Sequence, residues 1–373
     1  MKITVFGLTI SSSWGNGHAT PYRALLRALH RMGHQVHFFE KDVPYYHLRR
    51  DFDSCDYCHL TLYEDWQQIR RTAIEEAAES DVVITASYLP EGARINDEVL
   101  GLARPVRVFY DLDTPVTLAN MEKHGVDYIR PEQIADFDLV LSFTGGKALQ
   151  ELEQRYGARM ARALYGCVEP DDYRRIEPCR EYLCDLSYMG TYAPDRQQKV
   201  DDLFLEPARR HPEKQFLLAG SLYPWDWEWR WPANVRRMEH VAPHDHPKLY
   251  SSSRITLNIT RADMARWGWC PSGRFFEAAA CETPLITDWW EGLDCFFDVV
   301  HDLRVVSRPE QVEQALGMAH SELRELACHA RQRTLDDHTG RVRAMQLLQY
   351  LEEARSPGSR TRELSTAGSE AVQ

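Results

Sequence analysis

The sequence predicts an α/β protein with two doubly wound domains that face each other across a cleft. Its 373 residues, 43% of them hydrophobic, are too many for one ordinary core, so two domains are expected. Short β-rich runs alternate with segments of helical periodicity, as in a parallel sheet with crossover helices. This rhythm stops at a polar, proline-containing stretch and then begins again. Each half is therefore expected to form its own sheet.

The first half begins with a β-loop-α-β pattern. Ile3 to Leu8 is a short β-rich run, and the loop after it ends at Pro21, which suits the first turn of a helix. Residues 22–32 have helical periodicity, Gly33 ends that helix, and the next strand is 36–40. The elements that follow are a helix at 69–80, strands at 81–87, 106–113 and 138–146, and a helix at 148–157.

The second half repeats the alternation and sets the expected boundaries. We expect an N-terminal domain at 1–168, a linker at 169–185, a C-terminal domain at 186–355, and a disordered tail of small polar residues at 356–373. The expected strands are 185–192, 215–221, 235–242, 254–261 and 284–290, and the expected helices are 200–212, 245–253, 272–281, 309–320 and 321–353.

Composition narrows the class of protein. The net charge of −12 and the pI of about 5.7 disfavour a nucleic-acid surface, although a local basic groove stays compatible with them. The nine cysteines, an odd number, fit reduced thiols, and no apolar run approaches the ~18 residues of a membrane span or resembles a signal peptide. Cys55 and Cys58 precede His59, but no second ligand pair follows, so no metal site is expected. A cytoplasmic protein is the simplest interpretation.

Three loops at the expected carboxyl ends of strands carry unusual residues, and ligands bind at that edge of an open α/β sheet. In the first loop, Gly15, Asn16 and Gly17 precede His18. The two glycines allow close approach of a ligand to the backbone, and His18 is placed to face the cleft. Alternatively, the glycines only form a tight turn and His18 caps the helix. The spacing is not that of a dinucleotide-binding loop.

The second loop contains Asp111 and Asp113, directly after the strand at 106–110. Carboxylates at the end of a strand can bind substrate hydroxyls or a metal. Two aspartates in this spacing are a weak signal, and a solvated turn or a helix cap explains them almost equally well.

The third loop leads into the expected helix 272–281. Ser272 and Gly273 begin this helix, whose free N–H groups and partial positive charge suit a phosphate, and Arg274 adds a full charge. Arg261 follows the preceding strand and can add another cation. The Glu277 carboxylate, one turn inside, can accept hydrogen bonds from the two hydroxyls of a ribose. The alternative is an exposed Arg274–Glu277 pair at i,i+3, which the apolar sequence around it disfavours.

Several phrases of the sequence resemble the GT-B glycosyltransferases, and most closely their CgeB-like, group 1-type branch. The donor-site segment of that family is similar to SGRFFEAAACETPLITDWWEGLDCFF, and further similar phrases are FYDLDTPVTL, LSFTGG, YMGTYAPDRQ and LNITRADM. The resemblance implies two Rossmann-like domains. It also implies a nucleotide-sugar donor (UDP-, GDP- or dTDP-linked) in the C-terminal domain, an acceptor against the N-terminal domain, and no tightly bound cofactor.

The resemblance also implies roles for individual residues. Glu277 would bind the donor ribose, while Arg261, Arg274 and the amides of Ser272 and Gly273 would hold the diphosphate. His18 falls where inverting relatives place the catalytic base, and its ordinary pKa near ~6.5 suits proton removal at neutral pH. Asp113 would orient His18 or hold an acceptor hydroxyl.

Two positions depart from the family pattern. Group 1 enzymes often carry a glutamate eight residues before the ribose glutamate, where this chain has Trp269. The usual glycine after the donor helix is Glu282, which would cost on the order of 1 kcal/mol at positive φ and would place a negative charge near the diphosphate. Both departures favour a second hypothesis, a degenerate transferase that binds nucleotide or sugar without catalysis.

A third hypothesis is a scaffold that binds a protein partner through the aromatic and charged stretch WDWEWRW, residues 225–231. The same aromatics can stack on sugars or pack a loop onto the domain. The sequence leaves open the sugar, the nucleotide, the stereochemistry, the oligomeric state and the acceptor, which can be a small molecule, a polysaccharide, a protein or a DNA base. The acidic charge disfavours DNA.

Overall fold

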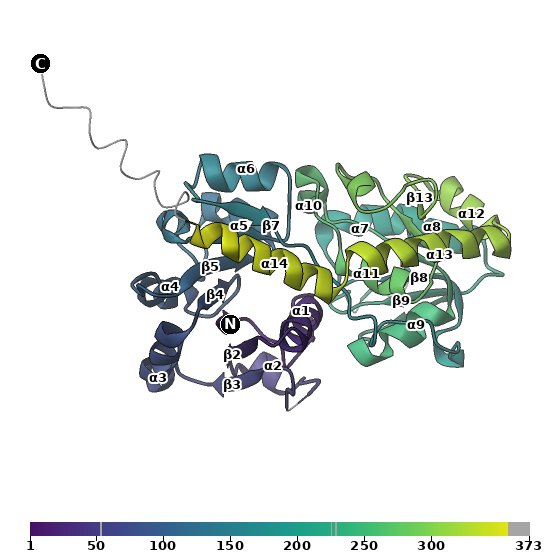
Figure 1. The fold of residues 1–373 in the computed structure, drawn as a ribbon. Helices are drawn as coiled ribbons and strands as arrows, with labels where there is room; N and C mark the ends of the chain where they lie inside the picture. Colours follow the sequence, from purple (N-terminus) through teal and green to yellow (C-terminus); the bar gives the residue numbers. More distant parts are fainter. Residues whose placement is uncertain (53, 225, 228–229, 357–373) are drawn as a thin grey trace, which may run out of the picture.

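The computed structural model shows two parallel β-sheets with helices packed around them (Figure 1). It describes residues 1–52, 54–224, 226–227 and 230–356. The expected tail at 356–373 lies outside these residues except for Ser356, as do three residues of the stretch 225–231. The predicted fold class, two α/β domains, is confirmed.

The N-terminal sheet has seven parallel strands in the order β3-β2-β1-β4-β5-β6-β7. Its first strand pairs with both β2 and β4, so β1 is central and the loop after it opens at the point where the strand order reverses. The strands are β1 (Lys2–Gly7), β2 (Gln35–Lys41), β3 (His59–Tyr63), β4 (Val82–Ala86), β5 (Val106–Asp111), β6 (Leu139–Ser142) and β7 (Ala161–Ala163). The helices are α1 (Ala19–Arg31), α2 (Pro44–His47), α3 (Trp66–Glu79), α4 (Gly92–Leu100), α5 (Thr114–Lys123) and α6 (Lys147–Gln154).

The C-terminal sheet has six parallel strands in the order β10-β9-β8-β11-β12-β13. Its strands are β8 (Cys184–Met189), β9 (Phe216–Ala219), β10 (Val235–Met238), β11 (Ser253–Asn258), β12 (Leu285–Thr287) and β13 (Leu303–Val305). Its helices are α7 (Pro194–Val200), α8 (Glu206–Arg210), α9 (His246–Ser252), α10 (Ala262–Trp267), α11 (Gly273–Ala280), α12 (Pro309–Gly317) and α13 (His320–Asp337). A π-helical turn, Asp201–Leu205, joins α7 to α8.

The last helix does not stay with the second domain. The expected helix at 321–353 is two helices, because the chain turns at His338 and Thr339 before α14 (Gly340–Arg355). Figure 1 shows α14 crossing to the N-terminal half, beside α1. Ala344, Leu347 and Leu351 are fully buried in the core of the first sheet. The second packing unit therefore ends near residue 339 rather than at the expected residue 355, because the buried leucines of α14 pack in the core of the N-terminal domain.

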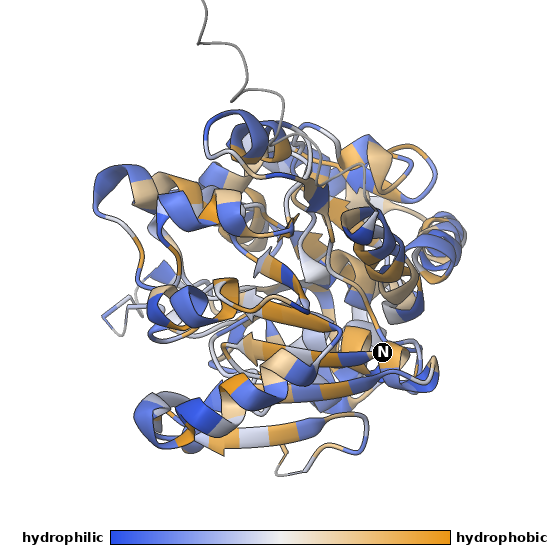
Figure 2. Ribbon diagram, turned by 60° about the vertical axis from the view of Figure 1, so that its left-hand side comes forward, coloured by the Kyte–Doolittle hydropathy of each residue, from blue (hydrophilic) through white to orange (hydrophobic). Residues whose placement is uncertain are grey.

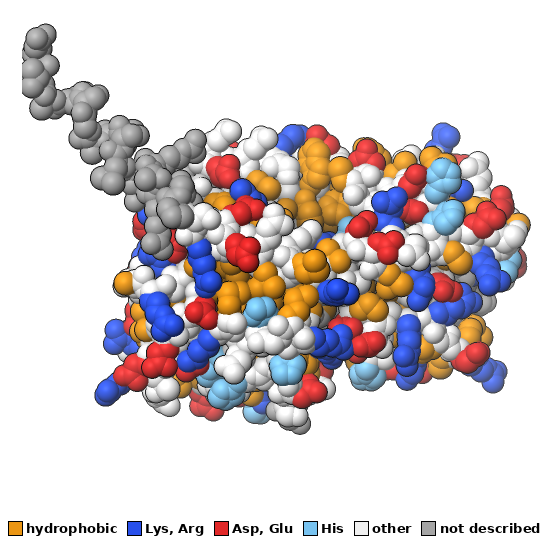
Figure 3. Space-filling model, in the orientation of Figure 1, with side chains coloured by type: hydrophobic (Ala, Val, Ile, Leu, Met, Phe, Trp, Pro, Cys, Tyr) orange, Lys and Arg blue, Asp and Glu red, His pale blue; other side chains and the backbone are white. Residues whose placement is uncertain are grey.

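Apolar strands fill the interior of both sheets, and the helices turn their polar faces outward (Figure 2). The face in Figure 3 shows Lys and Arg interspersed with Asp and Glu, without a continuous basic stripe. In the part of the chain that the structure describes, no helix combines the length and apolar character that a bilayer crossing requires. The expected linker, 169–185, contacts the first domain through ion pairs from Arg31 to Glu169 and from Arg27 to Asp172.

Candidate active site

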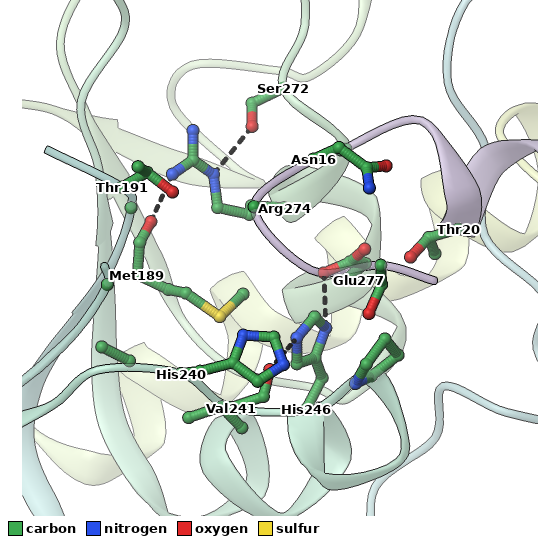
Figure 4. Close-up of a pocket in the computed structure, with 18 of the residues that line it drawn as sticks. Asn16, Thr20, Met189, Thr191, His240, Val241, His246, Ser272, Arg274 and Glu277 are labelled. Carbon is green, nitrogen blue, oxygen red and sulfur yellow. Dashed lines mark hydrogen bonds and ion pairs between the residues drawn. The ribbon is translucent and has the colours of Figure 1, made fainter. Parts of the chain in front are cut away.

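A cavity of about 270 Å³ lies between the two domains, where the carboxyl ends of strands from both sheets meet (Figure 4). This cavity, the interdomain pocket, combines the glycine loop after β1 with the loops after β8, β9 and β10 and the start of α11. The lining residues are Ser13, Gly15, Asn16, Gly17, Thr20, Pro21, Phe143, Cys167, Met189, Gly190, Thr191, Arg196, Ala219, Gly220, Ser221, Glu239, His240, Val241, Pro243, His246, Ser272, Gly273, Arg274 and Glu277.

One side of the interdomain pocket is cationic. Arg274 donates through Nε to Ser272 Oγ (2.9 Å) and through Nη1 to the carbonyl of Met189, and Arg196 donates to the carbonyl of Thr191. Burial lowers the pKa of Arg196 from its ordinary value, and the charge of Arg274 acts in the same direction. Among the described residues neither guanidinium has a carboxylate partner, and Arg196 Nε has no hydrogen-bond partner. Two such cations with free donors form a site for an anion.

The loop after β8 can approach these cations because it carries a glycine. A Cβ on Gly190 would lie 2.8 Å from Arg274 Nη1 and 2.9 Å from Arg196 Nη2. Ser272 stands at the N-cap of α11, but its side chain makes no capping bond, so the first N–H groups of the helix stay available to a ligand. Ser272, Gly273 and Arg274 all line the interdomain pocket.

Glu277 lines the same pocket, one turn further along α11 than Arg274. Its exposure is only 6%, and its Oε2 lies 3.2 Å from His246 Nδ1 and 3.5 Å from the hydroxyl of Tyr250. The alternative of an exposed ion pair with Arg274 is therefore wrong, because α11 packs with Glu277 facing inward. A buried carboxylate lining a polar pocket is suited to accept hydrogen bonds from hydroxyl groups.

Arg261 is placed differently from the rest of the expected donor set. It stands at the N-cap of α10, pairs through Nε with Asp195 at 3.5 Å, and does not line the interdomain pocket. Its charge still acts on Arg196, whose pKa it lowers. Arg261 is thus a neighbour of the cationic side.

The glycine loop is held by a buried carboxylate. Glu40, at the end of β2, accepts hydrogen bonds from Thr9 Oγ1 (2.8 Å) and from the backbone N–H groups of Ile10 (2.8 Å) and Ser11 (3.1 Å). Gly15 has φ of +65°, a conformation that disfavours other residues. The fixed loop presents residues 15–17 to the pocket.

The two domains touch over this pocket. The ring of Trp14 lies 4.6 Å from that of His240 in the other domain, and the guanidinium of Arg49 stacks on the same indole at 3.7 Å. The ring contact of Trp14 with His240 joins the two domains, whereas Arg49 belongs to the same domain as Trp14 and holds the indole in place.

His18 stands at the N-cap of α1 and does not line the interdomain pocket, contrary to the expectation that it faces the cleft. Its side chain makes no capping bond; instead Asn16 Oδ1 accepts from the N–H groups of His18 (3.1 Å) and Ala19 (3.2 Å). The ring of His18 packs on Tyr88 at 5.4 Å, and its Nδ1 is buried without a partner among the described residues. Burial lowers the pKa of His18, and the charge of Asp113 opposes this. The imidazole is consequently neutral at ordinary pH and can accept a proton.

Asp113 and Asp111 have different surroundings. Asp113 stands at the N-cap of α5, and its Oδ2 accepts from the hydroxyl of Tyr88 at 3.0 Å. Asp111 is buried and accepts from Asp113 N–H and Thr117 Oγ1, both at 3.0 Å; burial raises its pKa to about 6. Asp111 therefore shapes the loop, and Asp113 lies close enough to His18 to act on its charge. Neither lines the interdomain pocket.

Trp269 joins the two domains. Its N–H donates to the carbonyl of Glu291 (2.7 Å), and its carbonyl accepts from the N–H of Gly145 (3.0 Å). A Cβ on Gly146 would overlap its ring, so the indole fills the space over this glycine. The position where group 1 enzymes often carry a glutamate is thus occupied by an interdomain contact.

Glu282 has φ of +53°, the left-handed conformation in which a residue other than glycine is strained. Glu282 does not line the interdomain pocket, contrary to the expectation that its charge lies beside the donor site. Glu282 follows the carboxyl end of α11 and pairs with Arg331 (3.5 Å) and Arg175 (3.8 Å), whereas the pocket lies at the start of this helix, about 12 Å away at 1.5 Å per residue.

The described part of the stretch 225–231 packs onto its own domain. The ring of Trp227 lies 5.4 Å from Tyr192, and that of Trp231 lies 5.6 Å from Tyr223. This contact favours loop packing over an open sugar-stacking surface for these two residues.

Sequence reasoning missed several residues of the site. Arg196, His240 and His246 line the interdomain pocket but were not singled out. Arg196 falls within the phrase YMGTYAPDRQ, so the family resemblance carried a signal for it. No local pattern marked the two histidines, because strand order alone brings the ends of β8 to β11 together.

Comparison with known proteins supports the same architecture. Residues 196–349 match a family model described as glycosyl transferase-like. No curated protein sequence matches the chain. An alpha-glucosyltransferase in complex with UDP-glucose and DNA containing an abasic site has a similar structure (TM-score 0.72, 10% identity, covering 94% of this chain and 99% of that chain).

Two further solved structures have the same fold. Sucrose-phosphate synthase from Thermosynechococcus elongatus has a TM-score of 0.66 at 12% identity, over 95% of this chain and 98% of that chain. Anabaena HepE in complex with UDP and glucose has a TM-score of 0.61 at 11% identity, over 95% of this chain and all (100%) of that chain. The chain therefore has the GT-B fold of glycosyltransferases, as the resemblance implied.

Proposed function

We propose that this protein is a glycosyltransferase that moves a sugar from a nucleotide sugar to an acceptor hydroxyl. The observation that carries the proposal is the interdomain pocket, where two guanidiniums without a carboxylate partner among the described residues, the start of α11 and a buried carboxylate line one cavity with the glycine loop. The match of residues 196–349 and the fold support it. UDP sugars are the first donors to test among the UDP-, GDP- and dTDP-linked candidates, since the titles of similar structures include UDP and UDP-glucose.

The donor would lie along α11. Arg274, Arg196 and the N–H groups of Ser272 and Gly273 would hold the diphosphate, with Arg261 adding to the positive potential, and Glu277 would bind the ribose. Negative charge grows on the diphosphate as the bond to the sugar breaks, so fixed cations stabilise the transition state more than the ground state.

The acceptor would approach from the glycine loop, with Gly15, Asn16 and Gly17 forming its wall. His18 would remove the acceptor proton, and its lowered pKa keeps it neutral for that role. Asp113 would stabilise the imidazolium that forms, since its charge raises the pKa of His18. Asp111 would support the loop that holds Asp113. This assignment corresponds to an inverting reaction.

A non-catalytic nucleotide-binding protein is the second candidate, and Trp269 favours it. Its indole fills the interdomain contact at a position where group 1 enzymes often carry a glutamate. We also propose that the protein belongs to the CgeB-like branch, which the phrases FYDLDTPVTL and LSFTGG support. We further propose a cytoplasmic location, which the nine free cysteines support.

Thermal shift with UDP-glucose, GDP-glucose and dTDP-glucose tests donor binding, because a ligand that binds only the native state raises the melting temperature. We expect one of the three to raise it in a concentration-dependent way. Binding by none would contradict the proposal. Slow hydrolysis of the bound donor, measured as the release of free glucose, then distinguishes an enzyme from a non-catalytic binder. The non-catalytic binder leaves the donor intact.

A further inference from the structure

Cys55 and Cys58 hold their sulfur atoms 2.7 Å apart, in the connection between α2 and β3 (Figure 1). Both thiols are free and half-buried, and both pack against the core of the first sheet. A disulfide bond is about 2.05 Å long, so the two sulfurs need to move by less than about 1 Å to form one. The fold itself therefore places the pair close to the bonded arrangement.

The neighbours of the two thiols do not complete a metal site. His59, the next residue, turns its ring onto His37 of the neighbouring strand, and the ring centroids are 4.1 Å apart. Among the described residues, no group of three or more His, Cys, Asp and Glu side chains is placed to hold a metal ion. The chemistry that two such thiols share is oxidation to a disulfide.

The surroundings give the two thiols different roles. The hydrogen bond from the Cys58 thiol lowers the pKa of Cys55 to about 7 against the effect of burial, and the backbone N–H groups of Tyr57 and Cys58 act in the same direction. The same hydrogen bond and burial raise the pKa of Cys58. Cys55 is therefore the thiolate that attacks, and Cys58 keeps its proton until Cys55 has reacted.

We propose that Cys55 and Cys58 form a reversible oxidation site whose co-substrate is a small-molecule disulfide of the glutathione type. The Cys55 thiolate attacks one sulfur of glutathione disulfide, whose S–S bond breaks, and one glutathione thiolate leaves. Cys55 then carries no charge, so Cys58 can ionise and attack the Cys55 sulfur, which releases the second glutathione. The protein loses two electrons and the protons of both thiols, and one glutathione disulfide becomes two glutathione thiols.

The segment before the two thiols holds the glycine loop of the interdomain pocket. The N–H of Asp51 donates to the carbonyl of Ser11 (2.9 Å), and its carboxylate accepts from the N–H of Ser13 (2.8 Å). The guanidinium of Arg49 stacks on Trp14 at 3.7 Å. A disulfide shortly after this segment restricts its motion, so oxidation should also restrict the glycine loop. The inference goes beyond the proposed function and does not depend on it.

Peptide mass mapping of the full chain, after incubation with glutathione disulfide at about pH 7.5, tests the inference. The peptide that contains Cys55 and Cys58 should lose the mass of two hydrogens, and dithiothreitol should restore it. Cys295 and Cys328 are internal references, because both are exposed and neither contacts a second thiol among the described residues, so they should only gain glutathione. The inference is overturned if the peptide with Cys55 and Cys58 stays reduced or keeps a bound glutathione.

Two variants assign the roles of the thiols. Cys58→Ser keeps a hydroxyl that can donate to Cys55 but removes the second thiol, so glutathione should stay on Cys55 as a stable mixed disulfide. Cys55→Ser should leave Cys58 unmodified. The reverse pattern would overturn the assignment of Cys55 as the attacking thiol.

Hydrogen exchange tests the link between the disulfide and the glycine loop. Peptides from residues 9–17 and 48–52 should exchange their amide hydrogens more slowly in the oxidised than in the reduced protein. Equal exchange in the two states would overturn this link. None of these measurements uses a nucleotide sugar, so failure of the proposed function leaves their outcome unchanged.

Discussion

Replacing Arg274 by glutamine tests the cationic side of the interdomain pocket most directly. The glutamine retains much of the side-chain bulk but removes the charge. A charge-assisted hydrogen bond contributes about 1.5–3 kcal/mol, so the loss corresponds to about 10- to 150-fold weaker binding of UDP. Arg196 remains as a second cation, so the lower part of this range is expected.

Calorimetry with UDP and with uridine separates the contribution of charge to the binding affinity from the contribution of the shape of the site. Uridine has no diphosphate, so Arg274→Gln should leave its affinity little changed while UDP binding falls. The matched control is Arg266→Gln on α10, where a guanidinium that is 68% exposed pairs with Asp263 outside the pocket. Equal losses for UDP and uridine, or no loss for UDP, would refute the placement of the diphosphate beside Arg274.

The remaining predictions concern catalysis and stability. His18→Ala should lower kcat by a factor of about 10²–10⁴ and leave donor affinity little changed. The acid limb of the pH–rate profile, which burial of His18 places below about pH 6.5, should also vanish. A normal kcat with a raised acceptor KM and a product that retains the anomeric configuration would contradict the assignment of His18 as the base. Leu347→Ala should lower the free energy of unfolding by about 2–5 kcal/mol in urea titration, whereas Met345→Ala, 55% exposed on the same helix, should change it by less than about 0.5 kcal/mol; equal effects would contradict the packing of α14 on the first domain. Glu282→Gly should stabilise the protein by about 1 kcal/mol, because it relieves a left-handed backbone conformation at this residue. A lower melting temperature would instead show that the ion pairs of Glu282 outweigh this strain.

The sequence by itself determined the two α/β halves and pointed to several residues that line the interdomain pocket. Hydrophobic periodicity is a local property, and the buried strands and amphipathic helices follow from it. The same locality explains why Ser272, Arg274 and Glu277 were found: the start of a helix and the residue one turn inside it are fixed by spacing alone. Gly15 was found because its positive φ is a local demand of the turn.

Only the tertiary structure decided which side chains share a cavity. Arg196 follows β8, whereas His240 and His246 both follow β10, and the parallel order β10-β9-β8 brings these loops to one edge of the sheet. The partner of Glu277 was invisible for this reason, and so were the Arg331 partner of Glu282 and the interdomain place of Trp269.

The position of α14 was also beyond the sequence. Its apolar face predicts burial but carries no information about the surface that buries it. The chain turns at Thr339, and Leu347 then packs on the first domain rather than on its own. Periodicity within a helix is set by neighbours three and four residues away, whereas the choice of packing partner depends on surfaces that exist only after both sheets have formed.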